Sequence, residues 1–430
     1  MGGAVRDILL NKEPKDFDFT TNALPEETKE ILEKNNLKFY TVGEKFGTIA
    51  TKWDNEVVEI TTHRRDMTPG RHPDVSFTKY LKEDLMRRDF TINSMAMDKE
   101  GKIIDFFKGL EHLEKEVIKT TGKAEDRFKE DPLRMLRAIR FASQLNFNIR
   151  PSTKRAIREY APAIFDVSRE RWYQELTKLL LGKGVKRGLD LLYNTGLLGF
   201  VLPEVFVITL KDPTAKLHSK NLWEHTKAVV DNLPACEEFR WAGLLHDIAK
   251  PQTRIESDEV HFFKHEELGA ELADQVCRRL RISGHVSNKI VGLAKLHHRL
   301  SSVVSRKNDP PVSKKGLRRV IKAVEEYELT IEELLTFFEA DCSSENEKSI
   351  ERHAAHVALL KEAINNMEEE DLRPKLPRGI GHIIMSRFNL QPSEEVGKII
   401  NKIQQLLLDG EINPKLSASE MIDIIEKDGI

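Results

Sequence analysis

Apolar and polar positions follow two different periods along this chain. Up to about residue 120, short β-rich runs such as "KFYTV", "GTIATKW" and "VVEITT" stand between turn signals and short helical patterns, which predicts an α/β domain. From about Ala124 onward, apolar residues recur at three- and four-residue steps, as in "DPLRMLRAIRFASQL" and "RERWYQELTKLLL". This spacing predicts that the rest of the chain is a string of helices.

The pattern divides the chain into four parts and predicts a multidomain α+β protein. We expect an α/β head over 1–120, a helical neck over 121–200, a helical body over 201–345 and a helical tail over 346–430. The body is rich in histidine, since eight of the fourteen histidines lie between His218 and His298. Such a density marks a candidate metal region.

Composition narrows the setting and leaves the function open. The formal net charge of -2 over 430 residues means that a nucleic-acid partner must be held by local basic surfaces. Cys236, Cys277 and Cys342 stand far apart, with no C-x-x-C spacing, which argues against disulfides and thiolate zinc sites. Without a membrane-spanning apolar run or a signal peptide pattern, the sequence predicts a soluble cytoplasmic protein.

Two aspartates near the start are candidate ligands for a hard cation. In "KDFDFTTNA", Asp16 and Asp18 lie two residues apart among apolar neighbours, so on a strand both carboxylates point to the same face. Mg²⁺ is commonly bound by one or two carboxylates together with phosphate oxygens. Taken alone, the pattern is more often a solvated turn.

The preceding segment "GGAVRD" changes that balance. Two adjacent glycines followed by Arg6 form a turn whose backbone N–H groups can approach a triphosphate, while the guanidinium donates charge-assisted hydrogen bonds. Neither motif is specific alone, but a phosphate turn just before a pair of acids is typical of nucleotidyl transfer.

Further motifs follow in a fixed order. "GGAVRDILL", "DFDFTTNA", "RRDFTINSMAMD" and "EDPLRMLRAIRF" together resemble the motif series of the bacterial and eukaryotic class of CCA-adding tRNA nucleotidyltransferases and their poly(A) polymerase relatives. The resemblance covers about residues 1–182 and implies a polymerase β-like sheet in the head. It also implies that Gly3, Arg6 and Arg88 contact the triphosphate, that Asp16 and Asp18 are catalytic and hold Mg²⁺, and that Asp89 and Asn93 sense the ribose 2′-hydroxyl.

The last motif of the series would read the base. Asp131 and Arg134 are three residues apart, so on a helix we expect them to share one face, and Arg137 and Arg140 would extend that face by three residues each. The resemblance implies that this pair meets the Watson–Crick edge of CTP or ATP in place of a template. A ladder of ion pairs on a solvated helix is the plain alternative. Glu170 and Arg171 resemble a neck motif that would brace this helix.

Two departures from the family bear on the product and on the N-terminus. In "HRRDMTPGRHPD", Arg64, Asp66, Arg71 and Pro73 resemble remnants of a longer loop. A shortened loop there marks relatives that add only two cytidines, although surface loops also shorten neutrally. Relatives also carry a first strand before the double glycine, so we expect the native protein to be longer.

The histidine region resembles the HD phosphohydrolase superfamily. Its segments are "LWEHTKAVV", "GLLHDIAKPQT", "FFKHEELGAELA", "KLHHRL" and "FFEADCSS". The resemblance implies that His225, His246, Asp247 and Asp341 bind a divalent transition metal, with His265, His297 and His298 around them. Such a site can activate water against a phosphate ester, or the domain can serve as a body that holds tRNA.

The sequence therefore predicts template-independent addition of cytidines, CC or the complete CCA, to the tRNA 3′ end from CTP and ATP. The expected reaction is in-line attack of the 3′-hydroxyl on the α-phosphate. A poly(A) polymerase is the nearest alternative, and a phosphohydrolase with a non-catalytic RNA-binding head is the alternative from another class. The sequence does not specify the oligomeric state.

Overall fold

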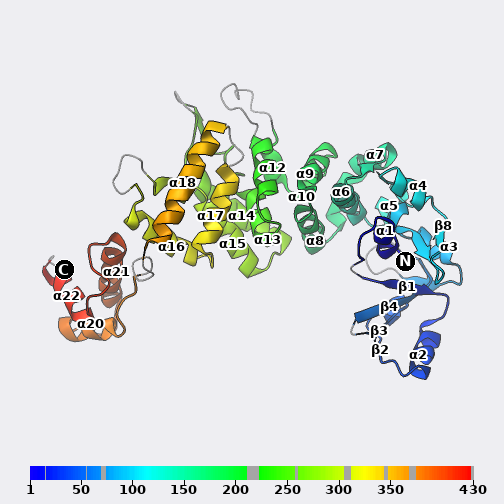
Figure 1. Cartoon of the computed structure of the whole chain (residues 1–430), viewed down its shortest axis with the longest axis horizontal. Helices are drawn as coiled ribbons and strands as arrows, with labels where there is room; N and C mark the ends of the chain where they lie inside the picture. The colour runs from blue at the N-terminus through cyan, green and yellow to red at the C-terminus, as the bar shows by residue number, and fades with distance from the viewer. Residues whose placement is uncertain are drawn as a thin grey trace. The chain divides into compact units, whose positions relative to one another are not determined.

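The computed structural model describes residues 1–14, 16–54, 56–68, 74–210, 222–256, 260–304, 311–342, 347–367 and 374–427. It divides into two compact units, Met1–Phe206 and Val207–Ile430 (Figure 1). In the part of the chain that is described, no helix is long and apolar enough to cross a membrane.

A four-stranded sheet forms the centre of the first unit. Its spatial order is β1 (Asp18–Thr21), β4 (Glu56–Thr62), β3 (Thr48–Trp53) and β2 (Phe39–Tyr40). The β1–β4 pair is parallel, and the other pairs are antiparallel. β-Branched residues in "TIATKW" and "EVVEITT" suit such strands. Helix α2 (Pro25–Lys34) packs against β3 and β4.

Shorter elements complete the head. Two further hairpins pair β5 with β6 and β7 with β8. The remaining elements before residue 120 are α1 (Gly3–Leu9), η1 (Glu44–Phe46), β5 (Arg64–Asp66), β6 (Val75–Phe77), α3 (Leu81–Met86), η2 (Thr91–Asn93), β7 (Met95–Met97), β8 (Ile103–Asp105), α4 (Gly109–Glu114) and β9 (Val117–Ile118).

Helices then follow, as the sequence predicts, with two exceptions. Strand β10 (Asn148–Ile149) pairs with β9 of the head, and the second unit contains a hairpin of β11 (Arg254–Glu256) and β12 (Val260–Phe262). Both are too short for periodicity to distinguish them from loops. The helices of this part are α5 (Ala124–Glu130), α6 (Leu133–Leu145), α7 (Pro151–Tyr160), η3 (Ala161–Asp166), α8 (Arg169–Leu180), α9 (Val185–Asn194), α10 (Leu198–Val201) and α11 (Pro203–Val207).

Helix α6 is the central helix of the neck. It packs against α8 and α9, and its buried face includes Met135 and Ile139. Trp172 on α8 is also fully buried, and its indole N–H donates to the carbonyl oxygen of Ile164 at 3.1 Å. Helix α6 is therefore held by buried apolar contacts with α8 and α9.

In its described residues, the second unit is mainly helical and contains the β11–β12 hairpin. Its helices are α12 (Leu222–Asn232), α13 (Glu237–Leu245), α14 (His265–Leu280), α15 (Gly284–Leu296), η5 (Arg299–Ser302), α16 (Lys314–Glu325), α17 (Ile331–Cys342), α18 (Glu347–Asn365), α20 (Ile380–Phe388), α21 (Glu394–Asp409) and α22 (Ala418–Lys427). Helices α12, α13, α15 and α17 pack together. The last three helices bury a separate core around Ile403 and Met421.

Candidate functional site

Two carboxylates lie on one side of two neighbouring strands in the head, and a third lies just before the first of these strands. Asp18 begins β1 and stands in parallel register with Glu59 of β4, so both side chains leave the sheet on the same side. Asp16 precedes the strand by two residues, and all three acids are exposed. Glu59 is therefore a further candidate metal ligand beside the two predicted aspartates, and the sequence motifs did not predict it. The only sequence feature that could have indicated it is a glutamate inside the β-rich run "VVEITT".

A hollow of about 380 Å³ opens beside Glu59. Its lining also includes Thr48 and Ala50 of β3, and Arg64. On the same side of the sheet, the hydroxyl oxygens of Thr48 and Thr61 lie 2.9 Å apart. The surface next to the acids is therefore concave and polar enough to receive part of a nucleotide.

The first glycine of the double-glycine turn has a steric role. Gly2 has φ 71°, and a Cβ there would lie 2.3 Å from Nη1 of Arg88. The backbone N–H of Gly2 donates to the carbonyl oxygen of Met95 at 2.9 Å. A Cβ on Gly3 would meet only Arg6, at 3.6 Å. The constraint thus falls on Gly2, one residue before the glycine expected from the motif.

Arg6 and Arg88 converge on Asn93 from two elements. Arg6 Nη1 donates to Oδ1 of Asn93 at 2.7 Å, and Arg88 Nη1 donates to the Asn93 carbonyl oxygen at 3.5 Å. Among the described residues, Nε of Arg88 is buried without a hydrogen-bond partner. Burial lowers the pKa of Arg88. A bound anion would supply the missing partner and offset the cost of burying the charge.

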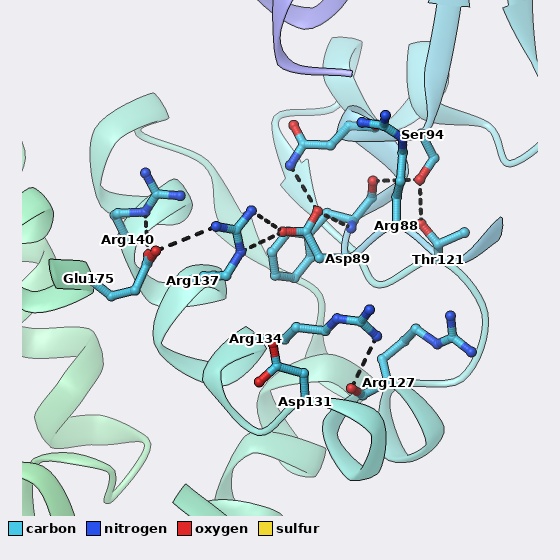
Figure 2. Close-up of polar contacts among 12 residues, drawn as sticks. Arg88, Asp89, Ser94, Thr121, Arg127, Asp131, Arg134, Arg137, Arg140 and Glu175 are labelled. Atoms are coloured by element: carbon cyan, nitrogen blue, oxygen red, sulfur yellow. Dashed lines mark hydrogen bonds and ion pairs between the residues drawn. The ribbon is translucent and has the colours of Figure 1, made fainter. Parts of the chain in front are cut away.

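Asp89 connects this region to α6. Its Oδ1 accepts from Nδ2 of Asn93 at 3.0 Å, and its Oδ2 accepts from Nε of Arg137 at 2.8 Å (Figure 2). Burial tends to raise the pKa of Asp89, but the charge of Arg137 and these hydrogen bonds hold it below its usual range. The same charge of Asp89 raises the pKa of Arg137. Asp89 and Asn93, expected at the ribose, are therefore already part of a buried polar chain.

The chain continues into α8 through Glu175. Glu175 lies 3.4 Å from Nη1 of Arg137 and 2.7 Å from Nε of Arg140 (Figure 2). The guanidinium carbon of Arg140 lies 4.1 Å from the centre of the Phe141 ring. Because Arg137 and Arg140 pair with the head and with α8, they do not form the solvated ladder considered above.

The expected base-reading pair is arranged differently from the prediction. Asp131 follows α5 and precedes α6, which begins at Leu133, so Asp131 and Arg134 do not share one helical face. Pro132 between them favours an extended conformation at the preceding residue, and Asp131 has φ −149°. Arg134 pairs with Glu130 at 2.6 Å.

Arg171 of α8 holds Asp131 in place. Its Nη1 and Nη2 donate to Oδ1 and Oδ2 of Asp131 at 3.2 and 2.7 Å. A carboxylate has about four acceptor positions, so Asp131 can still accept hydrogen bonds from a base. This geometry is consistent with the bracing role expected for Arg171.

The loop that bears on the product is only partly described. Arg64 and Asp66 form β5, which pairs with β6 in an antiparallel hairpin. Asp66 lies 3.9 Å from both Arg64 and Arg87. Arg71 and Pro73 lie outside the described residues.

The four residues expected to bind metal in the second unit come together. Nε2 of His225 lies 3.1 Å from Asp341 and 3.4 Å from Asp247, and Nε2 of His246 lies 3.2 Å from Asp247. Nδ1 of His246 lies 2.9 Å from the carbonyl oxygen of Gly243. A hydrogen bond there leaves Nε2 as the ligand atom.

The charges of this cluster suit a divalent cation. Burial opposes charge on His246, but Asp247 and Asp341 raise its pKa to about 10. The pKa values of Asp247 and Asp341 are held far below their usual range by the neighbouring histidines, against the effect of burial. Two buried carboxylates with two imidazoles could hold a borderline divalent metal, which would replace the imidazole protons.

Fold and sites together define a nucleotidyltransferase head followed by a helical metal-binding domain. Comparisons with protein families agree. The family "Poly A polymerase head domain" matches residues 1–119, "Probable RNA and SrmB- binding site of polymerase A" matches residues 146–208, and "HD domain" matches residues 217–346.

Relatives of known name are similar over part of their length. The CCA-adding enzyme of Bacillus licheniformis is 46% identical over 200 residues, which is 46% of this chain and 49% of that protein. The CCA-adding enzyme of Geobacillus stearothermophilus is 40% identical over 257 residues, or 59% and 60% of the two chains. The matched part of the chain thus spans about half to 60% of the length of these curated relatives.

Solved structures match nearly the whole chain. The crystal structure of the Bacillus stearothermophilus CCA-adding enzyme in complex with CTP has a TM-score of 0.64 and 26% identity, covering 99% of this chain and 93% of that one. A complex of a CCA-adding enzyme with ATP has a TM-score of 0.63 and 22% identity, covering 99% and 88%. The chain thus matches a poly(A) polymerase head domain, an RNA-binding segment of polymerase A and an HD domain in that order, and the first and last of these imply the use of divalent metal.

Proposed function

We propose that this chain adds cytidines to the 3′ end of tRNA from CTP, with ATP as the source of a terminal adenosine where one is added. The observation that carries the proposal is the register of Asp18 with Glu59, which puts the second acid of the D-x-D and a further carboxylate on one exposed strand face. The names of the relatives support tRNA as the acceptor, and the complexes with CTP and ATP support these two nucleotides.

Mg²⁺ is the metal proposed for the head. Asp16, Asp18 and Glu59 are exposed oxygen ligands that leave room for waters and phosphate oxygens, as Mg²⁺ requires. When bound, Mg²⁺ supplies Lewis-acid activation of the 3′-hydroxyl and charge stabilisation at the pyrophosphate. Oxygen ligands of this kind suit a hard cation.

The protein residues have separable tasks. Arg6 and Arg88 bind and orient the triphosphate so that the α-phosphate faces the tRNA 3′-hydroxyl in line. Asp131 accepts hydrogen bonds from the exocyclic amino group of cytosine or adenine, and Arg134 donates to ring acceptors. A uracil presents an oxygen where cytosine presents an amino group, so Asp131 rejects UTP.

One primer-extension assay tests the proposal. Unmodified tRNA without its CCA end, labelled CTP or ATP and Mg²⁺ are incubated with the chain, and the products are sized. We expect cytidine incorporation, reduced at least 100-fold in the variants Asp16→Asn and Asp18→Asn, because each loses a metal ligand. Asp54→Asn is the matched control, since Asp54 is an exposed turn residue. No incorporation, or full activity of both variants, would contradict the assignment.

The same assay reads the product. A product that ends after two cytidines supports the shortened loop around Arg64 and Asp66 as the determinant, whereas a third nucleotide from ATP shows full CCA addition. Repeated adenosine addition to RNA without a tRNA acceptor arm would instead indicate a poly(A) polymerase.

Glu59 is proposed as the third metal ligand. In the variant Glu59→Gln the side chain keeps its size and loses its charge, so we expect a higher Mg²⁺ requirement and a lower kcat, with KM for tRNA unchanged. Glu56→Gln, at the exposed start of the same strand, is the control. An unchanged Mg²⁺ titration for Glu59→Gln would remove it from the site.

A second activity is proposed for the HD domain, namely metal-dependent hydrolysis of phosphate esters. The set of His225, His246, Asp247 and Asp341 supports it, since the ligand atoms of His225, His246 and Asp341 lie within 4.8 Å of one another and Asp247 lies 3.2 Å from His246. Release of phosphate from p-nitrophenyl phosphate or a 2′,3′-cyclic nucleotide, dependent on added Co²⁺ or Ni²⁺ and abolished in His246→Asn, tests it. A metal-bound but inactive HD domain would support a purely structural role.

A further inference from the structure

One face of the four-stranded sheet carries a row of side chains that spans its whole width. The registers place Asp18 of β1 beside Glu59 of β4, and Glu59 beside Ala50 of β3. Ala50 in turn pairs with Tyr40 of β2. Because paired residues on neighbouring strands point to the same side of a sheet, the four residues lie on one face, which we call the acid face. None of the four is buried.

The opposite face of the sheet is covered by α2. Ile49 and Thr62 point to that face and are buried, and the hydroxyl of Thr62 donates to the carbonyl oxygen of Ala23 at 2.8 Å, just before α2. The acid face is open by contrast, although it carries large apolar side chains, since Tyr40 is 51% and Val57 is 66% exposed. Exposed apolar groups that gather beside a catalytic centre mark a binding surface.

The arginines proposed to bind the triphosphate lie at one end of this row. β1 is an edge strand of the sheet, and the amino group of Met1 donates to the carbonyl oxygen of Asp18, so the turn that leads to Arg6 borders β1. Burial lowers the pKa of Arg88, and the charge of Asp18 is among those that oppose this lowering, which puts Arg88 near the same strand. The rest of the acid face extends away from these arginines, through β4 and β3 to β2.

In-line transfer determines the side from which the RNA acceptor arrives. The attacking 3′-hydroxyl and the leaving pyrophosphate lie on opposite sides of the α-phosphate. With the pyrophosphate beside β1, the hydroxyl approaches over β4 and β3. The hollow of about 380 Å³ lies on this path, and its lining includes Glu59, Ala50 and Phe46. A hollow of this size can receive a nucleoside.

Beyond the hollow, the acid face offers the two groups that bind single-stranded nucleic acid. Tyr40 lies two strand spacings, or about 10 Å, from Glu59, and its exposed ring can stack on a base. Lys52 follows Ala50 by two residues, so it points to the same face, where it stands opposite Val57 and is exposed. Its positive charge is complementary to a phosphodiester.

We propose that the acid face binds the last nucleotides of the RNA acceptor. The hollow beside Glu59 receives the terminal nucleoside, Tyr40 stacks on the base that precedes it, and Lys52 pairs with a phosphodiester. The inference rests on the proposed nucleotidyl transfer and adds the acceptor side of that site. Tyr40 and Lys52 are positioning residues for the 3′-hydroxyl and do not contact the incoming nucleotide, so their replacement affects the acceptor alone.

Steady-state extension by CTP tests the stacking contact. The acceptor is tRNA that already carries the first added cytidine, so that two unpaired nucleotides end the chain. We expect Tyr40→Ala to lower kcat/KM for this tRNA about 10-fold, because one stacked base is lost, while KM for CTP stays at the parent value. Tyr40→Phe keeps the ring and should retain the parent kcat/KM. Circular dichroism establishes that each variant is folded.

Trp53→Ala is the matched control for Tyr40→Ala. Trp53 is an aromatic residue of the same sheet and is 63% exposed. It follows Ala50 by three residues on β3, so its side chain points to the opposite face. We therefore expect Trp53→Ala to extend the tRNA with the kcat/KM of the parent chain.

A modified acceptor shows whether the contact of Tyr40 is with a base. When the nucleotide before the terminal cytidine is abasic, the parent chain and Trp53→Ala should extend the tRNA about 10-fold less efficiently. Tyr40→Ala has no stacking left to lose, so it should extend the ordinary and the abasic tRNA with equal kcat/KM.

The salt dependence of KM for tRNA tests Lys52. Loss of one phosphate contact with a single strand should lower the slope of log KM against log salt concentration by about 0.7 in Lys52→Gln. Lys34→Gln is the control, because Lys34 is an exposed residue at the end of α2, and it should keep the parent slope. An unchanged slope in Lys52→Gln would remove the phosphodiester contact.

The outcomes separate the acceptor surface from the transfer reaction. Equal kcat/KM values for Tyr40→Ala and Trp53→Ala would overturn the stacking contact while incorporation of CTP by the parent chain stands. A penalty for the abasic tRNA that is as large in Tyr40→Ala as in the parent chain would overturn it as well. If the parent chain incorporates no CTP into any acceptor, the proposed transfer fails and the acceptor surface fails with it.

Discussion

Removing Arg171 should disturb base selection without touching the nucleotide. The guanidinium makes two of the three described hydrogen bonds to the Asp131 carboxylate, the third coming from the backbone N–H of Leu133 at 3.2 Å. The pair is part-buried, with side-chain exposures of 17% and 16%. A charged bidentate contact of this kind is worth about 2 kcal/mol. If that energy positions Asp131, Arg171→Ala lowers kcat/KM for CTP about 30-fold.

The diagnostic measurement is discrimination between CTP and UTP. Asp131 accepts from the amino group of cytosine and repels the O4 of uracil, so a displaced Asp131 should lower kcat/KM for CTP more than for UTP. Arg171→Lys keeps the charge and loses the bidentate geometry, so its CTP/UTP discrimination should lie between that of the parent chain and that of Arg171→Ala. A general loss of stability would instead lower kcat/KM equally for CTP and UTP.

The control is Arg158→Ala. Arg158 also makes two hydrogen bonds, both to the carbonyl oxygen of Asn194, at 3.1 and 2.9 Å. We expect discrimination by this variant to match that of the parent chain. If Arg171→Ala retains the parent CTP preference, Asp131 is not positioned by α8, and the bracing argument is wrong.

Two further predictions follow from steric and electrostatic features. Gly2→Ala should cost about 1–2 kcal/mol in unfolding free energy from its positive φ and raise KM for CTP through the contact with Arg88. Gly101→Ala is the control, because φ is 84° there and a Cβ meets nothing within 4 Å, so it should lose stability without a change in KM for CTP. Equal KM values for CTP in the Gly2→Ala and Gly101→Ala variants would contradict the proposed clash with Arg88. In the metal-free chain, Asp247 raises the pKa of His246 to about 10 against the effect of burial, so its contribution to stability is complete below about pH 6.5 and lost as pH rises through about 10. With chelator present, the melting temperature of the parent chain should therefore fall more between pH 7 and pH 10 than that of His246→Asn. Parallel curves of melting temperature against pH would refute this.

The head motifs could be located from sequence because each depends on local chemistry. A D-x-D on a strand would fix the direction of both carboxylates by alternation, but β1 begins only at Asp18, so alternation places Asp18 and not Asp16. Glu59 could not be assigned, because its place beside Asp18 comes from a parallel pairing across 41 positions. Nothing within "VVEITT" specifies which strand lies next to it.

The base-reading segment shows a second limit. The three-residue spacing of Asp131 and Arg134 predicted a shared helical face, yet Pro132 ends the extended stretch and α6 begins only at Leu133. A proline at the first turn of a helix could have signalled this boundary. The bond from Arg171 to Asp131 joins residues 40 positions apart, a contact that only the packing of α8 beside α6 provides.

The buried charges of the head imply that binding of the triphosphate and orientation of the base are linked. Arg137 is paired with Asp89, and Arg140 with Glu175. Among the described residues, Arg88 makes only the long bond to the carbonyl of Asn93 and has a buried Nε without a partner. An incoming triphosphate would therefore meet a buried guanidinium whose Nε still lacks a hydrogen-bond partner and could supply that partner. Since Asn93 also binds Asp89, and Asp89 binds Arg137 of α6, the phosphate site and the helix behind the base-reading pair share one continuous set of charged hydrogen bonds.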